Sequence, residues 1–352
     1  MVLLDDLLAA CVYNEGSDLH LKAESSPLIR IYGDLMPLDI DPLSPEEVRQ
    51  LCLSPLTDIQ KARFLDELEL DFAYEIEGLA RFRGNLYVQR GNVGGAFRVI
   101  PYEIKTIDDL QLPEICKRFS ERPRGLILVT GPAGSGKSTT QAAMIDYINR
   151  NYPTHIITIE DPVEFVHTDM QALINQRELD TDTLSFPNAL RAALREDPDV
   201  ILIGEMRDLE TIKLAITAAE TGHLVFGTLH TTDSVQTVDR VIDVFPAHQQ
   251  SQVRQQMSAN LLGVVSQNLV KRLDGQGRIA VFEILVAIPA VRNLIREGKT
   301  HQIGSLIQVG QRHGMISLDQ SLANFVISKM VSYDDAIARA SNVTEFRALV
   351  GR

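Results

Sequence analysis

The sequence predicts an α/β protein in two parts: a small α+β domain, then a mostly parallel sheet with helices on both faces. Three observations predict this. Apolar residues alternate with period two in much of the first 100 residues, short apolar runs alternate with helical segments after residue 124, and a glycine-rich loop follows the first of those runs. A chain of 352 residues is long enough for two or three such domains.

The composition is that of a soluble globular protein, with 45% hydrophobic and 23% charged residues. A formal net charge of −13 argues against a broad surface for nucleic acid, so no nucleic-acid partner is expected. The first eight residues hold two aspartates where a secretory signal needs an apolar core, and no stretch approaches the roughly 18 apolar residues of a membrane span. Cys11, Cys52 and Cys116 lack the spacing of a metal site or a disulfide framework. We therefore expect a cytoplasmic protein.

Residues 1–100 are predicted to form the small α+β domain. Its expected elements are a helix over residues 3–12, strands at 18–22 and 29–32, a helix over 44–52, a helix from about 57, an antiparallel hairpin of 70–76 and 81–88, and a strand at 96–100. Ser44, Pro45 and Glu47 form the pattern of a capping box at a helix start. Residues 101–123 are expected to be a connector with a short helix near 112–119.

The second part is predicted from four apolar runs separated by helical segments. These strands are expected at 126–129, 155–159, 200–203 and 224–229. Beyond Asp233 the pattern is helical, with a helix from Pro246 to about Leu262, and one more strand is expected at 280–286. Helices from 289, 301, 317, 332 and 343 are expected to form a C-terminal bundle, so the division is a core at 124–288 and a helical region at 289–352.

The glycine-rich loop satisfies the spacing G-x-x-x-x-G-K-[ST] between a strand and a helix. In this context backbone N–H groups and the helix N-terminus bind phosphates, the lysine reaches the β- and γ-phosphates, and the serine hydroxyl binds Mg²⁺. ATP and Mg²⁺ are therefore the expected cofactors. The residues expected to bind the nucleotide are Gly131, Pro132, Ala133, Gly134, Ser135, Gly136, Lys137, Ser138 and Thr139.

Acidic residues follow two of the predicted strands. Glu205 comes after the strand at 200–203 and is the candidate for polarising the attacking water or, with Ser138, for holding the magnesium shell. Glu160, Asp161 and Glu164 follow the strand at 155–159, and three close carboxylates suit a magnesium–nucleotide site because a cation relieves their repulsion. The alternatives are a surface glutamate for Glu205 and a solvated acidic turn for the other three.

Histidines stand at both ends of the strand at 224–229. His230, at the carboxyl end, is expected to donate a hydrogen bond to the γ-phosphate, while His223 lies at the opposite end and is a weaker candidate. Arg81, Arg83 and Arg98 are expected to point outward from strands of the first domain, where they would serve the nucleotide of a neighbouring subunit. Solvated strand faces are the alternative for these arginines.

Together these motifs resemble the secretion-type ATPase superfamily, and within it the type IV pilus retraction ATPases of the PilT family, over nearly the whole chain. The resemblance is carried by residues 131–140, 157–165, 203–208 and 222–231. Assembly ATPases resemble this core but usually have a longer N-terminal extension and a four-cysteine zinc insertion, which this sequence lacks. Residues 290–297 closely match the AIRNLIRE motif that the family links to retraction, with Val291 in place of isoleucine.

The resemblance implies a homohexameric ring with a PAS-like first domain, a RecA-like second domain and ATP bound between them. It implies hydrolysis coupled to domain motion, with the first-domain arginines reaching nucleotide across a subunit boundary. The motor would be peripheral to the membrane, docked from the cytoplasm on an inner-membrane platform protein at the pilus base. A PilU-like accessory role beside a paralogous ATPase, a nucleotide-gated scaffold with little turnover and a DNA-translocating ATPase are the alternatives; the acidic charge disfavours the last.

Overall fold

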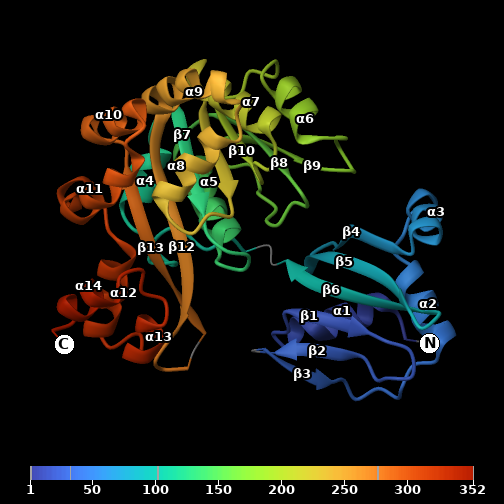
Figure 1. The fold of residues 1–352 in the computed structure, drawn as a ribbon. Coiled ribbons are helices and arrows are strands. Elements are labelled where there is room, and N and C mark those ends of the chain that lie inside the picture. Colours follow the sequence, from blue (N-terminus) through green and yellow to red (C-terminus); the bar gives the residue numbers. More distant parts are fainter. Residues whose placement is uncertain (1, 32, 101–102, 276, 352) are drawn as a thin grey trace. The chain divides into compact units, whose positions relative to one another are not determined.

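The computed structural model describes residues 2–31, 33–100, 103–275 and 277–351 (Figure 1). The chain divides into two compact units, Met1–Glu103 and Ile104–Arg352, and each is described by itself. Residues 104–123, expected to be a connector, belong with the second unit. The helix α4 (Ile115–Ser120) accounts for this, because Cys116 and Phe119 are buried in the core of that unit. Residues 101 and 102 lie outside the described part.

The first unit is a six-stranded antiparallel sheet in the order β3-β2-β1-β6-β5-β4. Its strands are β1 (Asp18–Leu21), β2 (Leu28–Ile31), β3 (Asp34–Pro37), β4 (Glu69–Ile76), β5 (Ala80–Gln89) and β6 (Asn92–Ile100). Its helices are α1 (Leu4–Tyr13), α2 (Pro45–Leu53) and α3 (Asp58–Glu67). All expected elements are present, and β3 is an additional edge strand. The predicted strand end at residue 32 lies outside the described residues.

Local sequence signals set the starts of α2 and α3 in the first unit. Ser44 and Thr57 each accept a hydrogen bond from a backbone N–H three residues on, and each is closed by a capping box. The apolar face of α1 is buried against the sheet with Phe82 and Phe97, both of which are fully buried. The predicted capping box at Ser44 is thereby confirmed.

The second unit is built on a seven-stranded sheet in the order β13-β12-β7-β11-β10-β8-β9. All neighbouring pairs are parallel except β12 and β13. The strands are β7 (Gly125–Thr130), β8 (His155–Glu160), β9 (Leu173–Glu178), β10 (Val200–Ile203), β11 (Leu224–Leu229), β12 (Leu261–Lys271) and β13 (Arg278–Val286). The expected mostly parallel sheet is confirmed.

Alternating residues of the central strands face two separate cores. Leu126 and Leu128 of β7 pack into one core, while Ile127 and Val129 pack into the other. The first core also holds residues of α6 (Phe186–Ala193), α7 (Leu209–Glu220), α8 (Ser234–Asp243) and α9 (Ala247–Asn260), and the second holds α4 and α5 (Lys137–Asn151). Helices therefore cover both faces, as expected (Figure 1).

Two strands of this sheet were not predicted. The helix expected to reach Leu262 ends at Asn260, and the chain enters β12 at once. Strand β9 lies at the edge of the sheet, and four of its six residues are polar or charged. β12 is the more important correction, because it is hydrogen-bonded along β7, the strand that leads into the glycine-rich loop.

The C-terminal helices are divided between two places rather than gathered in one bundle. Val291 and Ile295 of α10 (Pro289–Glu297) and Ile303 and Ile307 of α11 (Ile303–Val309) complete the first core of the sheet. A separate cluster joins α12 (Leu318–Ile327), α13 (Tyr333–Ile337) and α14 (Val343–Leu349) to the far parts of β12 and β13. The expectation of a single bundle was therefore wrong. The long β12–β13 hairpin has apolar residues near its base and near its turn, and different helices pack on each.

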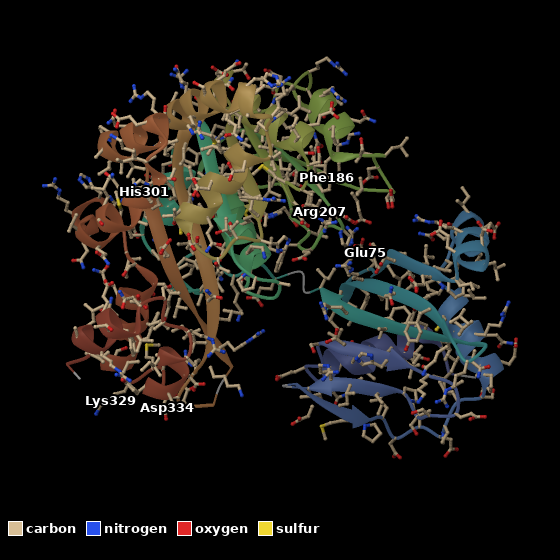
Figure 2. The ribbon with its side chains drawn as sticks, viewed as in Figure 1. Glu75, Phe186, Arg207, His301, Lys329 and Asp334 are labelled. Atoms are coloured by element: carbon tan, nitrogen blue, oxygen red, sulfur yellow. The ribbon has the colours of Figure 1, made fainter. Side chains whose placement is uncertain are left out.

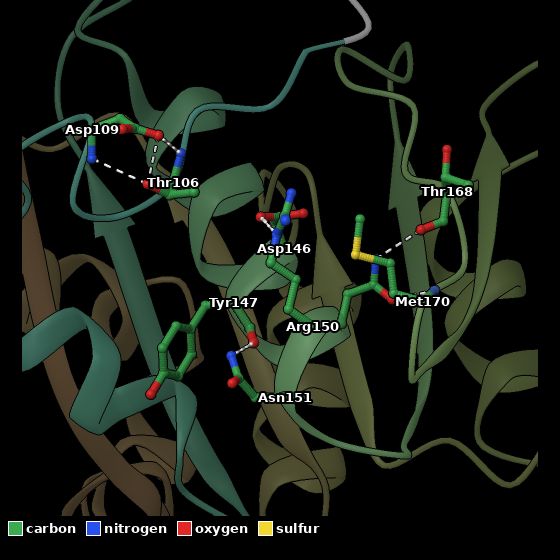
Figure 3. Close-up of polar contacts among 9 residues, drawn as sticks. Thr106, Asp109, Asp146, Tyr147, Arg150, Asn151, Thr168 and Met170 are labelled. Carbon is green, nitrogen blue, oxygen red and sulfur yellow. Dashed lines mark hydrogen bonds and ion pairs between the residues drawn. The ribbon is translucent and has the colours of Figure 1, made fainter.

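Helix α5 is anchored at the end opposite to the glycine-rich loop (Figure 3). The side chain of Asn149 donates to the carbonyl of Thr168 at 2.8 Å and accepts from the backbone N–H of Met170 at 3.0 Å. Arg150 Nε donates to Asp146 Oδ2 at 2.6 Å. The two contacts of Asn149 hold the helix against the segment that leads into β9, whereas the Arg150–Asp146 pair lies within the helix. Within the described residues, no helix combines the length and the apolar character needed to cross a membrane.

Candidate nucleotide site

The glycine-rich loop lies between the end of β7 and the start of α5. Gly131 and Gly136 have φ angles of +142° and +86°, in the region that favours glycine. A Cβ on Gly131 would lie 2.2 Å from the carbonyl oxygen of Gln267, and one on Gly136 would lie 2.8 Å from that residue's side-chain nitrogen. Both glycines are therefore required by conformation and by the close approach of β12.

The lysine of the loop is buried, with 8% of its surface exposed. Lys137 Nζ donates to the carbonyls of Gly131 at 2.9 Å and Pro132 at 3.0 Å, so the ammonium group lies over the loop. Burial lowers the pKa of Lys137, and the carboxylates of Glu205 and Glu164 oppose that shift. The amine is thus held where a phosphate chain on the loop would meet it.

The other predicted residues of the loop differ in exposure. Ser135 is buried, and its hydroxyl has no hydrogen-bond partner within the described part of the chain. Ser138 and Thr139 are half-buried in the first turn of α5, and residues 132–134 are exposed. An orphaned buried hydroxyl and an exposed loop backbone at a helix N-terminus fit a phosphate ligand.

A buried polar layer supports the loop, and sequence reasoning missed it. Gln267 on β12 is 3% exposed, and its Oε1 accepts a hydrogen bond of 2.7 Å from Thr140 Oγ1 on α5. Gln141 accepts one of 2.9 Å from Thr228 on β11. The layer therefore ties α5 to the two strands that flank β7. Polar residues inside an otherwise apolar strand were the available signal.

Glu205 follows the end of β10, and its side chain is 18% exposed. Its Oε1 lies 2.5 Å from Arg207 Nε and 3.0 Å from His230 Nε2. Burial raises the pKa of Glu205, but the hydrogen bonds and charges of Arg207 and His230 outweigh burial, so that the net shift is downward. The carboxyl group is accordingly held ionised. Arg207, labelled in Figure 2, was not among the predicted residues.

The two histidines of β11 have different surroundings. His230 follows the carboxyl end of the strand, is half exposed and contacts Glu205. His223 precedes the strand, and its Nδ1 lies 2.9 Å from the carbonyl of Ala218 at the end of α7. The structure brings His230 and Glu205 together, while His223 has a structural contact at the other end of the strand.

The three acidic residues after β8 have unequal surroundings. Glu160 is half-buried, and its Oε1 accepts hydrogen bonds from Thr158 at 2.7 Å and Gln176 at 3.2 Å. Burial raises the pKa of Glu160 to about 7, although these hydrogen bonds oppose the shift. Asp161 and Glu164 are exposed; the charge of Asp161 acts on Arg207, and that of Glu164 acts on Lys137.

The arginines of the first unit form cross-strand contacts within that unit. Arg83 and Arg98 are direct neighbours in the β5–β6 register. Each is also paired with an acid: Arg98 Nε lies 2.9 Å from Asp18 Oδ1, and Arg83 Nε lies 3.7 Å from Asp71 Oδ1. The side chain of Arg98 is 69% exposed, whereas Arg81 and Arg83 are half-buried. Arg98 is therefore the most accessible of the three.

Sheet topology explains why the motifs of the second unit meet. The loop follows β7, His230 follows β11, Glu205 follows β10 and Glu160 ends β8, and these four strands are consecutive parallel neighbours. Their carboxyl ends share one edge of the sheet, where ligands bind in open α/β folds. In the described residues no group of three or more His, Cys, Asp or Glu side chains could hold a metal by itself.

Comparison with known proteins finds relatives over most of the chain. Residues 105–337 match the family model described as Type II/IV secretion system protein. The chain is 51% identical to the type IV pilus retractation ATPase PilT of Pseudomonas aeruginosa, over 96% of this chain and 98% of that one. It is 53% identical to a twitching motility protein of Neisseria gonorrhoeae, over 90% of this chain and 85% of that one.

Solved structures give the same result. The crystal structure of the pilus retraction motor PilT with bound ADP matches with a TM-score of 0.92 and 43% identity, covering 98% of this chain and 99% of that one. The mixed α/β architecture is therefore that of the secretion ATPases. With these matches over nearly its full length, the chain belongs to the PilT family of type IV pilus retraction ATPases.

Proposed function

We propose that this protein is the ATP-hydrolysing motor that retracts type IV pili and so powers twitching motility. The observation that carries the proposal is the meeting of Lys137, Glu205 and His230 at the carboxyl edge of one parallel sheet, in a chain of the PilT family. The phosphate loop alone is common to many nucleotide-binding proteins. A polarising carboxylate beside it is what hydrolysis requires.

In this proposal each group has one task. Backbone N–H groups of residues 131–139 bind the phosphates, and Lys137 leaves its carbonyl partners to neutralise the β- and γ-phosphates. Glu205, held ionised by Arg207 and His230, accepts a proton from the attacking water. His230 then donates a hydrogen bond to the terminal phosphate. Glu160, Asp161 and Glu164 are assigned to the nucleotide-binding wall beside Lys137.

Mg²⁺ is the cation assigned to this site. The hydroxyl of Ser138 in the first turn of α5 would be its protein ligand, and Glu205 would contact its water shell. When bound, the ion would supply positive charge that offsets the negative charge of the phosphates.

The proposed assembly is a homohexameric ring. In such a ring Arg81, Arg83 and Arg98 of one subunit would stabilise phosphate charge at the site of the next subunit, and the high exposure of Arg98 supports this. The first unit is assigned a PAS-like fold, the core at 124–288 a RecA-like fold, and residues 289–352 the helical region. The ring would be cytoplasmic, docked on an inner-membrane platform protein, with a paralogous retraction ATPase as a further partner.

The proposal is tested by deleting the gene and rescuing it with the wild-type or Lys137→Ala form. Surface pili and twitching movement are scored together. Excess pili with lost movement in the Lys137→Ala strain are expected of a retraction motor. Absent pili would indicate an assembly ATPase, and full movement would leave only an accessory or scaffold role. Phosphate release by the purified protein separates a scaffold from a motor, since a scaffold gives turnover equal to a blank.

A further inference from the structure

A second concave site lies at the opposite edge of the sheet from the phosphate loop. It is a cavity of about 330 Å³ between α4, the start of β12, the end of β13 and the start of α10. Leu262 stands where β12 enters the sheet beside the first residues of β7, whereas the loop follows the last residue of β7. The cavity therefore shares no residue with the nucleotide site.

The floor of this cavity is apolar and its rim is cationic. Phe119 and Ile115 of α4 are buried at the floor, beside Leu262. The rim holds the arginines Arg118, Arg122, Arg292 and Arg312, together with His313. No lining residue is acidic, although the chain has 47 acidic and 34 basic side chains. The lining of this cavity therefore contains basic residues and no acidic ones, although acidic residues outnumber basic ones in the chain.

The rim arginines lack carboxylate partners. Among the described residues, Arg118, Arg122 and Arg312 form no ion pair, and Arg312 Nε donates only to His313 at 3.1 Å. Arg98, Arg207 and Arg272 show the contrast, since each is paired with an acid. Surface pairs are individually weak, but several unpaired guanidinium groups around one cavity create a positive field that an anionic ligand would relieve.

Arg292 is held by backbone carbonyls rather than by a carboxylate. Its guanidinium group is half-buried and donates to three backbone carbonyls, those of Ala287 at 2.8 Å, Ser258 at 2.7 Å and Ala259 at 2.5 Å. Two of these carbonyls lie in the last turn of α9, so the arginine also faces the negative end of that helix. The group is held rigidly in place with only partial charges around it.

We propose that this arginine-rimmed cavity docks an acidic segment of a protein partner. An apolar side chain of the segment enters the cavity, and Asp or Glu residues on either side pair with the rim arginines. The cavity has the volume of a small-molecule site, but its cationic groups come from three separate segments: α4 with the residues just after it, α10, and the turn at 311–313. We infer that several carboxylates of one chain suit this arrangement better than a single anion does. Guanidinium groups suit carboxylates because they bind them bidentately.

The probe is a fluorescein-labelled peptide, Glu-Asp-Phe-Leu-Asp-Glu, titrated with the full-length protein at low salt and followed by anisotropy. We expect saturable binding that weakens as salt is added. Arg118→Glu and Arg312→Glu should each weaken it about tenfold or more. Lys329→Glu, which makes the same charge change at an exposed lysine remote from the cavity residues (Figure 2), should leave it unchanged. Phosphate release reports that each variant remains folded.

Two further measurements test whether the cavity binds a small anion or a second copy of this chain instead. The peptide Glu-Asp-Ser-Ser-Asp-Glu keeps the charges and removes the apolar anchor; equal binding of this peptide, or full competition by citrate, would show a site for small anions and overturn the proposal. A change of oligomeric state in Arg312→Glu, measured by light scattering, would assign the cavity to a second copy of this chain and overturn it as well. If both Arg118→Glu and Arg312→Glu still bound the peptide as tightly as wild type, the proposal would also be overturned.

Discussion

One oxygen of Glu205 is held by two loops at once: His230 Nε2 lies 3.0 Å from Oε1, and Arg207 Nε lies 2.5 Å from the same atom. Both contacts use Oε1. Two positive or proton-donating groups also keep the carboxyl ionised. In the proposed mechanism Glu205 is the proton acceptor, and its orientation is set by the residue after β11 and by the turn after β10.

The first prediction concerns that carboxylate. Glu205→Gln keeps the size and hydrogen-bonding ability of the side chain but removes its basicity, so turnover should fall by about 100-fold or more while ATP still binds. Steady-state phosphate release and equilibrium binding of a fluorescent ATP analogue measure the two effects. The matched control is Glu220→Gln, an exposed glutamate at the end of α7. Undiminished turnover in Glu205→Gln would remove this residue from the mechanism.

The second prediction concerns Arg207. Its hydrogen bond is the main influence that lowers the pKa of Glu205 against the effect of burial. Activity that needs the ionised carboxylate is lost as pH falls through that pKa, so Arg207→Met should move the acid limb of the rate profile to higher pH. Arg191→Met, which breaks a surface ion pair with Glu210, should leave the limb in place. If the acid limb of the pH–rate profile did not move in Arg207→Met, a group other than Glu205 would set that limb.

The phosphate loop and its partners differ in how far sequence could predict them. The loop could be predicted because its sequence signal is local: the motif, the strand before it and the helix after it lie within about 20 residues. Glu205 and His230 were predicted from strand ends, since parallel strands bring their carboxyl ends together. Gln267 and Thr140 are separated by 127 residues, and only the pairing of β12 with β7 brings them into contact.

The missed strand explains why that contact was hidden. Helix α9 passes into β12 with no turn residue between Asn260 and Leu261. The buried polar residues Ser266 and Gln267 also interrupt the apolar run. In the first unit the alternating pattern of β4 and β5 was clear because one face is buried, whereas all four residues of edge strand β3 are exposed and carry no pattern.

The third prediction tests the first-unit arginines. Arg98 is mostly exposed and its ion pair with Asp18 is a surface pair, so Arg98→Ala should cost at most about 1 kcal/mol of stability. Hydrolysis should nevertheless fall, and mixing Arg98→Ala subunits with wild type should depress the rate below the average of the two. Arg49→Ala, an exposed arginine on α2, is the control. A rate that follows the simple average would mean that Arg98 is a solvated strand residue.

The fourth prediction uses the raised pKa of Glu160. A carboxyl group with a folded-state pKa of about 7 and an ordinary unfolded value binds more protons when folded between those two values. The free energy of unfolding should therefore fall as pH rises from about 4.5 to 7. Glu160→Gln should remove this part of the slope in urea titrations. Glu164→Gln removes a charge that contributes to the raised pKa of Glu160, so it should reduce this part of the slope only slightly. Equal slopes in wild type and Glu160→Gln would mean that the group titrates normally.

The last prediction separates support of the loop from overall stability. Gln267→Leu leaves the Thr140 hydroxyl buried without its acceptor, which should cost about 1–3 kcal/mol, and it removes the side-chain nitrogen packed against Gly136. Adding Thr140→Val removes the orphaned hydroxyl, so the double variant should recover stability and yet still bind ATP more weakly than wild type. The matched control is a neighbouring buried pair, Thr130 at the end of β7 and Ser266 on β12, replaced as Thr130→Val with Ser266→Ala. If ATP affinity recovered together with stability, Gln267 would be a packing residue with no role in shaping the phosphate loop.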